Sequence, residues 1–205
     1  MSDAPTSVPA TARRALVWDA PNLDMTLAGI LQAKPAPSQR PDFDAVGRWL
    51  VATAAEGLAV EATVFINVRE GMEARLTSWT AWLTSVGFGV FAKPKHDDSD
   101  IDEDMVAHVR DLHERGELAD LVVASHDARR WTAVLEALAA EGVHVSVLGF
   151  PEMAGGLAQS DAIAVVDLES VPGAITERLP RLVLSDLPAA GRYFAPRGTL
   201  GATHR

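Results

Sequence analysis

Hydrophobic residues along this chain fall into short continuous runs that alternate with longer amphipathic stretches. The continuous runs predict strands at residues 15–19, 62–68, 87–92, 119–125 and 144–148, with residues 161–168 either a sixth strand or the end of a helix. Strands of a parallel sheet are buried on both faces and therefore read as unbroken apolar runs. Apolar residues at helical spacing predict helices at residues 22–31, 42–56, 71–86, 102–115 and 131–141, the first with Asn22 as its N-cap. This alternation predicts an α/β fold with a mostly parallel central sheet flanked by helices.

The two ends of the chain differ from its middle in composition. Residues 1–12 are rich in Ser, Thr, Pro and Ala, and they predict a disordered tail without the apolar stretch of a signal peptide. Residues 169–205 carry prolines spaced through short apolar stretches, so we expect a C-terminal extension that packs on the domain or on a partner, which includes a second copy of the chain. The chain therefore divides into one domain at residues 13–168 and two extensions.

Composition narrows the class of protein. The chain has no cysteine, which excludes disulfides and thiolate metal sites and is compatible with a reducing cytoplasm. No apolar run approaches the roughly 18 residues of a membrane span, so we expect a soluble cytoplasmic protein without a membrane partner. The formal net charge of −10 argues against a nucleic-acid coat protein, which would carry a basic face. Any RNA binding is expected to be weak and sensitive to salt.

Four acidic residues stand where an apolar strand or a helix begins or ends. Asp19 ends the first strand, Asp102 begins a helix, Asp127 follows the fourth strand, and Asp161 precedes the last apolar run. In open parallel sheets the functional site lies outside the carboxyl ends of the strands. Carboxylates gathered there repel one another unless a hard divalent cation such as Mg²⁺ or Mn²⁺ neutralises them. The pattern therefore predicts a metal-dependent enzyme that acts on phosphate esters.

The same motifs resemble those of NYN domains, a PIN-like ribonuclease family. The segment from Leu16 to Asn22 resembles the family's opening strand, which reads apolar-apolar-Asp-x-x-Asn. Residues 102–105 resemble the start of its third helix, and residues 121–127 resemble its strand that ends in Ser-Gly-Asp. Residues 142–161 resemble its closing strand and late Asp. The resemblance covers residues 13–168 and implies a PIN-like Rossmannoid fold and a Mg²⁺- or Mn²⁺-dependent ribonuclease.

Carried over residue by residue, the resemblance implies a metal-binding and catalytic pocket that contains Asp19, Asp102, Asp127 and Asp161. It further implies that Asn22 and Ser125 support this pocket and that RNA is the substrate. An ion in the pocket would activate a water for in-line attack on phosphorus. Three positions depart from the family pattern: Arg129 and His108 stand where Asp is frequent, and Ala20 stands where Gly is common. The first two departures remove negative charge from the predicted pocket.

Each of these residues also has a structural interpretation. Asp19, Asp102 and Asp127 could serve as turn or helix-cap residues, with Asp100 and Asp104 as rivals to Asp102. Arg129 and Arg130 could grip a substrate phosphate or lie in solvent. The histidines, His108 and His126, could bind metal or be ordinary half-exposed side chains, and Trp79, Trp82 and Trp131 are expected in the core.

Two alternative functions remain open from the sequence. The first is a catalytically weakened module of the same fold that binds RNA or a protein partner. The second is a phosphatase-type α/β protein in which Asp19 is covalently modified, although the Asp-x-Asp of many such enzymes is absent after Trp18.

Overall fold

The computed structural model describes residues 11–96 and 101–196. Most of the predicted N-terminal tail lies outside these ranges. So do Asp97, Asp98 and Asp100, which precede the predicted helix at residues 102–115, and the last nine residues of the C-terminal extension.

The described residues form one six-stranded sheet in which every neighbouring pair is parallel. The strands are β1 (Arg13–Asp19), β2 (Ala59–Val68), β3 (Gly89–Pro94), β4 (Leu118–Ala124), β5 (His144–Gly149) and β6 (Ala164–Asp167). The α-helices are α1 (Ala20–Leu31), α2 (Phe43–Ala52), α3 (Glu73–Ser85), α4 (Ile101–Glu114) and α5 (Ala128–Ala140). The strand order β3-β2-β1-β4-β5-β6 confirms the predicted α/β architecture.

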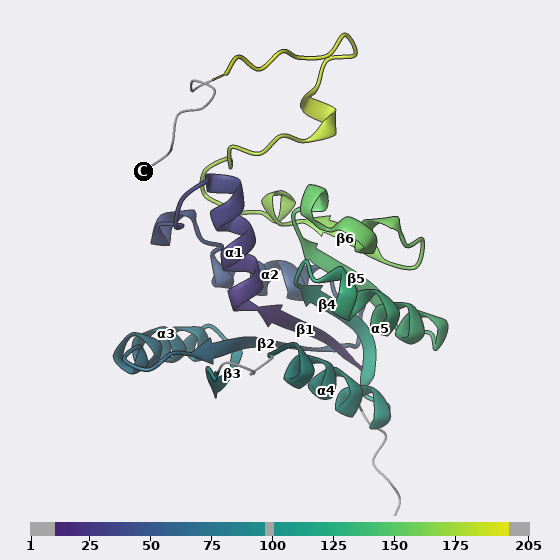
Figure 1. Ribbon diagram of the computed structural model, residues 1–205. Helices are drawn as coiled ribbons and strands as arrows, with labels where there is room; N and C mark the ends of the chain where they lie inside the picture. Colours follow the sequence, from purple (N-terminus) through teal and green to yellow (C-terminus); the bar gives the residue numbers. More distant parts are fainter. Residues whose placement is uncertain (1–10, 97–100, 197–205) are drawn as a thin grey trace, which may run out of the picture.

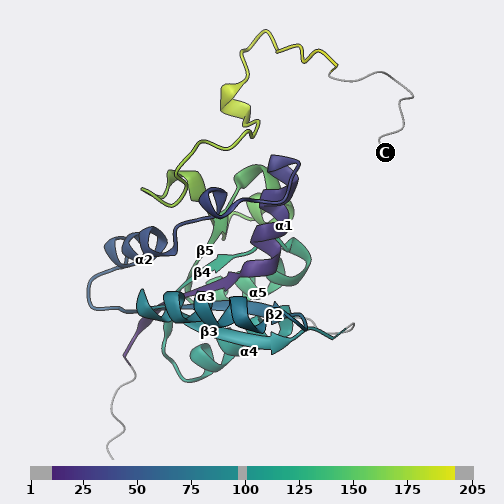
Figure 2. The same ribbon diagram turned by 90° about the vertical axis from the view of Figure 1, so that its left-hand side faces the viewer.

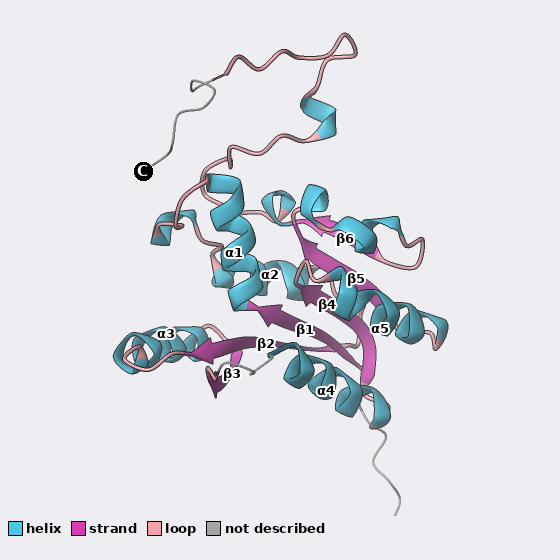
Figure 3. Cartoon of the chain, in the orientation of Figure 1, coloured by secondary structure: helices cyan, strands magenta, loops and turns pink. Residues whose placement is uncertain are grey.

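Helices cover both faces of the sheet (Figures 1 and 3). One hydrophobic cluster joins α4 and α5 to residues such as Val17 and Phe65. A second cluster joins α1, α2 and α3 to residues such as Trp18 and Val64 on the opposite face. Consecutive residues of β1 therefore point into different clusters, because side chains alternate across a strand. Burial on both faces explains why β1 and β4 are continuously apolar.

The first helix begins earlier than its sequence predicts. Asp19, not Asn22, is the N-cap of α1, and its side chain accepts a hydrogen bond from the backbone N–H of Asn22. Pro21 fits the first turn because its missing N–H is not needed there. The prediction of Asn22 as the cap is therefore wrong, and the Asn22 side chain can make a different contact.

The predicted core positions of the tryptophans hold for two of three residues. Trp131 is fully buried, and Trp79 packs against the cluster under α1, α2 and α3. Trp82 is 41% exposed, although its ring still contacts the edge of Phe43 with centroids 6.0 Å apart.

The first part of the segment that follows β6 packs against the domain, and its later part does not. Leu168, Val171, Ala174 and Leu179 are buried in the cluster under α1, α2 and α3. Beyond residue 182 most side chains are exposed, and both views show this part of the chain running away from the sheet (Figures 1 and 2). None of the helices in the described ranges has the length and hydrophobicity needed to cross a membrane.

Candidate functional site

The strand order reverses between β1 and β4, and this point is where the candidate site lies. From β1 the chain builds outward to β2 and β3 on one side, then returns to place β4, β5 and β6 on the other. The connections diverge at such a switch point, so a crevice forms outside the carboxyl ends of the two central strands. Asp19 ends β1, and Ser125 directly follows β4.

Asp19 is the centre of the site. Asp19 is only 3% exposed, and its Oδ1 accepts a hydrogen bond from the backbone N–H of Asn22 at 2.9 Å. The hydroxyl of Ser125 donates to its Oδ2 at 3.3 Å, and a hydrogen-bond contact joins it to the carboxyl of Asp102. Among the described residues, no Arg, Lys or His side chain forms an ion pair with Asp19. This buried carboxyl therefore depends on neutral donors and on a second acid.

Burial raises the pKa of Asp19 above its ordinary value, since the charged carboxylate is poorly solvated there. Hydrogen bonds from Asn22, Ser125 and Asp102 oppose this shift, while the nearby negative charge of Asp127 adds to it. A hydrogen bond between two carboxyl groups needs a proton on one of them. Burial of this pair thus favours a proton on one of the two carboxyls, Asp19 or Asp102, unless a cation takes its place.

The other two central acids lie at the starts of helices. Asp127 is the N-cap of α5, and its Oδ1 accepts from the backbone N–H groups of Arg129 and Arg130 at 3.0 and 3.3 Å. Asp102 is in the first turn of α4, and its Oδ1 is buried. The partial positive charge of a helix N-terminus stabilises a carboxylate. The capping role suggested by the sequence is therefore real for Asp127, but it occupies only one of its two oxygens.

Asn22 links the first helix to the end of β4. Its Oδ1 accepts from the backbone N–H of His126 at 2.9 Å. The His126 ring accepts from the N–H of Phe150 at Nε2, at 2.8 Å, and its Nδ1 lies 3.2 Å from the hydroxyl of Thr26. These contacts require the neutral imidazole, and burial lowers the pKa of His126 to about 4. In the structure His126 is thus a packing and hydrogen-bonding residue.

The structure brings together Asp19, Asp102, Asp127, Asn22 and Ser125, but it places the fourth predicted acid elsewhere. Asp161 is exposed in the turn that precedes β6, at the amino ends of the strands. The acid at the carboxyl end of that strand is Asp167, whose Oδ1 bonds with Arg181 at 2.6 Å. The order of residues agrees with this placement, because Asp161 precedes the apolar run of β6 and Asp167 ends it; the assignment of Asp161 to the site rested on the family resemblance and is wrong.

The remaining candidates lie around the site. Arg129 is exposed at the start of α5, and Arg130 follows it. His108 is one to two turns along α4 from Asp102, with its Nε2 3.8 Å from Glu61 and its ring against Phe65. His108 therefore belongs to a neighbouring surface and not to the group around Asp19.

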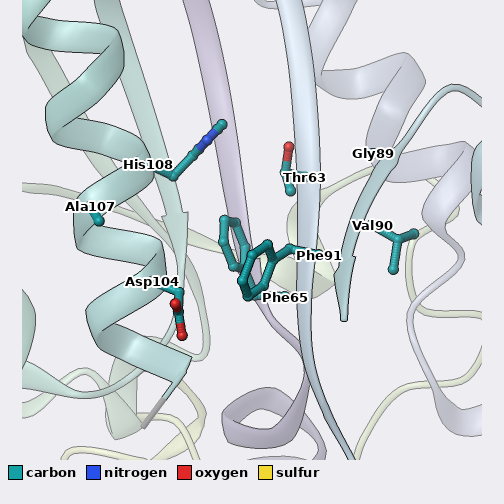
Figure 4. A pocket seen from close by; sticks show the side chains of 8 residues that line it. All are labelled: Thr63, Phe65, Gly89, Val90, Phe91, Asp104, Ala107 and His108. Carbon is teal, nitrogen blue, oxygen red and sulfur yellow. The ribbon is translucent and has the colours of Figure 1, made fainter. Parts of the chain in front are cut away.

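That surface is a groove of about 500 Å³ between α4 and the edge strand β3. Figure 4 shows the rings of Phe65 and Phe91 in its floor, with Asp104 and His108 on the helix beside them. The ring centroids of Phe65 and Phe91 are 5.3 Å apart, and Phe91 is 39% exposed. Asp19 pairs in register with Phe65, and Phe65 pairs with Phe91. The aromatic floor thus begins one strand away from Asp19.

The chemistry of the site fits a hard divalent cation. Carboxylate and hydroxyl oxygens of Asp19, Asp102, Asp127 and Ser125 are the donors that Mg²⁺ and Mn²⁺ prefer. Asn67, two residues beyond Phe65 on the same face of β2, has a buried Oδ1 without a hydrogen-bond partner in the described structure. Within residues 11–96 and 101–196, no three His, Asp or Glu side chains are drawn together as for direct coordination. Mg²⁺ commonly uses one or two carboxylates and keeps several waters, which this arrangement suits.

Comparisons with known proteins address the family and the fold. A family model for the NYN domain matches residues 13–169. Among solved structures, the fold is similar to the crystal structure of a protein of unknown function from Vibrio parahaemolyticus, with a TM-score of 0.55 and 18% identity. The alignment covers 77% of this chain and 94% of that one, and at this identity the likeness concerns the fold alone. The search of curated proteins found no match.

Proposed function

The chain belongs to the NYN domain family, whose fold is that of PIN-like nucleases, and from this premise we propose that it is a divalent-metal-dependent ribonuclease. One observation carries the proposal. Asp19 is buried at the switch point of the sheet among oxygen donors and other acids, without a cationic side chain as its partner in the described residues. A buried charge is costly unless it is paired or coordinates a metal.

In this proposal Asp19, Asp102 and Asp127 hold the ion, which is Mg²⁺ or Mn²⁺, and the hydroxyl of Ser125 lies beside it. When bound, the ion supplies charge neutralisation and activation of a water for attack on phosphorus. Asp19 is held rigidly because its two oxygens receive hydrogen bonds from α1 and from the end of β4. Without a cation these acids would repel a phosphodiester, so binding of the ion and of the substrate are expected to go together.

RNA is the substrate that the surroundings support. Arg129 is exposed at the start of α5, two residues from Asp127, where a guanidinium could pair with a backbone phosphate. The groove beside α4 offers Phe91 as a stacking surface for an unpaired base. The carboxylates near this groove are already paired, Asp104 with Lys93 at 2.7 Å and Glu61 with Arg13 at 3.0 Å. An aromatic floor with neutralised acids suits a single-stranded substrate, which we propose to be a cytoplasmic RNA.

A cleavage assay tests the proposal. Purified protein with Mn²⁺ should cut a labelled single-stranded RNA of mixed sequence, and EDTA should stop the reaction. Asp19→Asn should lower the rate by at least about 100-fold, because it removes charge from the reacting centre. Asp111→Asn, a matched change at an exposed acid of α4 that pairs with Arg115, should leave the rate unchanged. Cleavage that survives both EDTA and Asp19→Asn would refute metal-dependent catalysis at this site.

A second candidate function is a catalytically weakened module that binds RNA. The observation that favours it is the lack of three convergent acidic or histidine side chains in the described part of the chain. Arg129, which stands where the sequence resemblance predicts a further Asp, also removes negative charge from the site. Retention of the labelled RNA without cleavage, with any divalent ion, would establish this function in place of the first.

A further inference from the structure

The C-terminal extension is fastened to the domain by one buried arginine. Arg181 lies beyond the family match, and its side chain is only 3% exposed. Its Nε and Nη2 donate to the two carboxylate oxygens of Glu152, both at 2.7 Å. Its Nη1 donates to Asp167 at 2.6 Å and to Glu169 at 2.9 Å. Arg181 thus joins the segment after β6 to Glu152, which follows β5, to Asp167 at the end of β6, and to Glu169 just after β6.

This ion cluster is strong because one planar guanidinium serves three carboxylates. Burial alone would lower the pKa of Arg181, but its hydrogen bonds with Asp167 and Glu152 outweigh burial and raise it. A Lys at this position would keep the charge but not the paired, planar contact with Glu152. Loss of Arg181 would leave three neighbouring carboxylates without their shared partner.

The same guanidinium lies over an aromatic ring that leads toward the candidate site. The Cζ of Arg181 is 5.2 Å from the ring centroid of Phe150, which is almost fully buried. Phe150 stacks on His126, with centroids 5.8 Å apart and planes inclined by only 6°. Gly149 provides the space for this stack, because a Cβ there would lie 2.4 Å from Nε2 of His126. Arg181, Phe150 and His126 therefore form a continuous column.

The column ends between two residues of the site. His126 stands directly between Ser125, which bonds with Asp19, and Asp127. Its own position is fixed by Phe150 at Nε2, by Thr26 near Nδ1 and by Asn22 at its backbone N–H. A shift of the His126 ring would consequently move the backbone that carries Ser125 and Asp127.

We propose that the C-terminal extension is a working part of the site, with Arg181 as a positioning residue that acts through Phe150 and His126 on Ser125 and Asp127. This inference rests on the proposed function for its catalytic consequence. Its structural part, the placement of residues 125–127 by Arg181, does not depend on RNA cleavage.

The test compares Arg181→Lys with Arg178→Lys in the full chain. Arg178 lies on the same extension, but it is exposed and, among the residues that the structure describes, forms its ion pair with Asp186. Arg181→Lys should move the backbone amide NMR resonances of residues 125–127. It should also lower kcat by about 10- to 100-fold, the cost of a small misplacement of reacting groups, and leave KM within about twofold. Arg178→Lys should do neither. If Arg181→Lys melts more than a few degrees lower, Phe150→Leu tests the same column with the ion cluster intact.

A double-mutant comparison separates positioning from general support of the fold. In a His126→Ala background, Arg181→Lys should cost no more than about twofold in kcat, because its route to the site is already broken. The proposal is overturned if the losses of the two changes multiply, or if Arg181→Lys moves only resonances near Glu152, Asp167 and Glu169. If the unaltered protein does not cleave RNA, the proposed function fails, and the resonances of residues 125–127 alone decide this proposal.

Discussion

The hydroxyl of Ser125 donates to Oδ2 of Asp19 across 3.3 Å, although 106 positions separate the two residues in the sequence. This contact joins the carboxyl ends of β1 and β4, where the strand order reverses. It also shows how the acidic site is held before any ion binds. A neutral donor fixes the buried carboxylate in place without cancelling its charge, which remains available to a cation.

The buried charge of Asp19 should lower the stability of the protein when no ion is bound. In EDTA, Asp19→Asn should melt higher than the unaltered protein, by about 2–4 °C for each 1 kcal/mol gained. The reason is that burial raises the pKa of Asp19, so the carboxylate disfavours the folded state at neutral pH. The folded protein keeps this proton to a higher pH than the unfolded chain, whose carboxyl has a pKa of about 3.9.

The dependence on pH follows from the same shift. The stability contributed by Asp19 is fully present below about pH 3.9 and is lost as the pH rises through the higher, folded-state pKa. The advantage of Asp19→Asn should therefore grow as the pH rises above about 4. Melting curves of both proteins across pH in EDTA measure this difference. An advantage that does not change with pH, or a lower melting temperature, would contradict the assignment.

His126 should produce the opposite dependence. Burial lowers its pKa to about 4 from about 6.5, against a smaller opposing effect of the Glu152 charge, so protonation favours the unfolded chain. The contribution of neutral His126 to the free energy of unfolding is fully present above about pH 6.5. It is lost as the pH falls toward 4, by about 3 kcal/mol in all. Urea unfolding at pH 7 and pH 4.5 should show this loss in the unaltered protein and not in His126→Gln. His113→Gln, at a partly exposed histidine of α4, should behave like the unaltered protein, and equal losses in all three would exclude His126 as the cause.

Phe91 should contribute to substrate affinity. Stacking of a base on an aromatic ring is worth about 1–3 kcal/mol, so Phe91→Ala should raise KM for single-stranded RNA about 10-fold or more, with kcat little changed. Trp82→Ala is the matched control, because Trp82 is exposed to a similar degree but its ring contacts Phe43, which is buried on the opposite face of the sheet. Steady-state kinetics of the two variants decide the matter. Equal effects would show that exposed aromatic area, and not the groove, determines KM.

Arg129 should contribute to RNA affinity through its charge alone. If it pairs with a substrate phosphate, Arg129→Ala should weaken RNA binding uniformly and reduce the slope of log affinity against log salt by about 1. Arg75→Ala, a matched change at an exposed arginine of α3, should leave that slope unchanged. Binding titrations at several salt concentrations measure the slopes, and an unchanged slope in Arg129→Ala would assign this side chain to solvent.

Much of the fold could be predicted because its signals are local. The unbroken apolar runs of β1 and β4 reflect burial on both faces, and an acid directly after such a run must lie at the carboxyl edge. Asp19 and Asp127 were placed correctly for this reason. Asp161 lies at the opposite edge because it precedes its apolar run, and only the family resemblance assigned it to the site.

Contacts that depend on tertiary packing had no such signal. The column from Arg181 through Phe150 to His126 joins three distant segments, and each residue taken alone is unremarkable in the sequence. The exposure of Phe91 likewise depends on the position of β3 at the sheet edge, beyond the cover of α4. The prediction of Asn22 as a helix cap was wrong because its side chain accepts a hydrogen bond from the distant backbone N–H of His126 instead.

A calorimetric titration with Mn²⁺ of the unaltered protein, Asp19→Asn and Asp161→Asn tests directly whether a divalent-ion site is centred on Asp19. We expect that the unaltered protein binds the ion, that Asp19→Asn weakens binding by at least about 10-fold, and that Asp161→Asn binds as well as the unaltered protein. A bound ion should also raise folding stability, by about 2.7 kcal/mol at a hundredfold excess over Kd. Absence of Mn²⁺ binding by the unaltered protein, or equal weakening by the two substitutions, would contradict a divalent-ion site centred on Asp19.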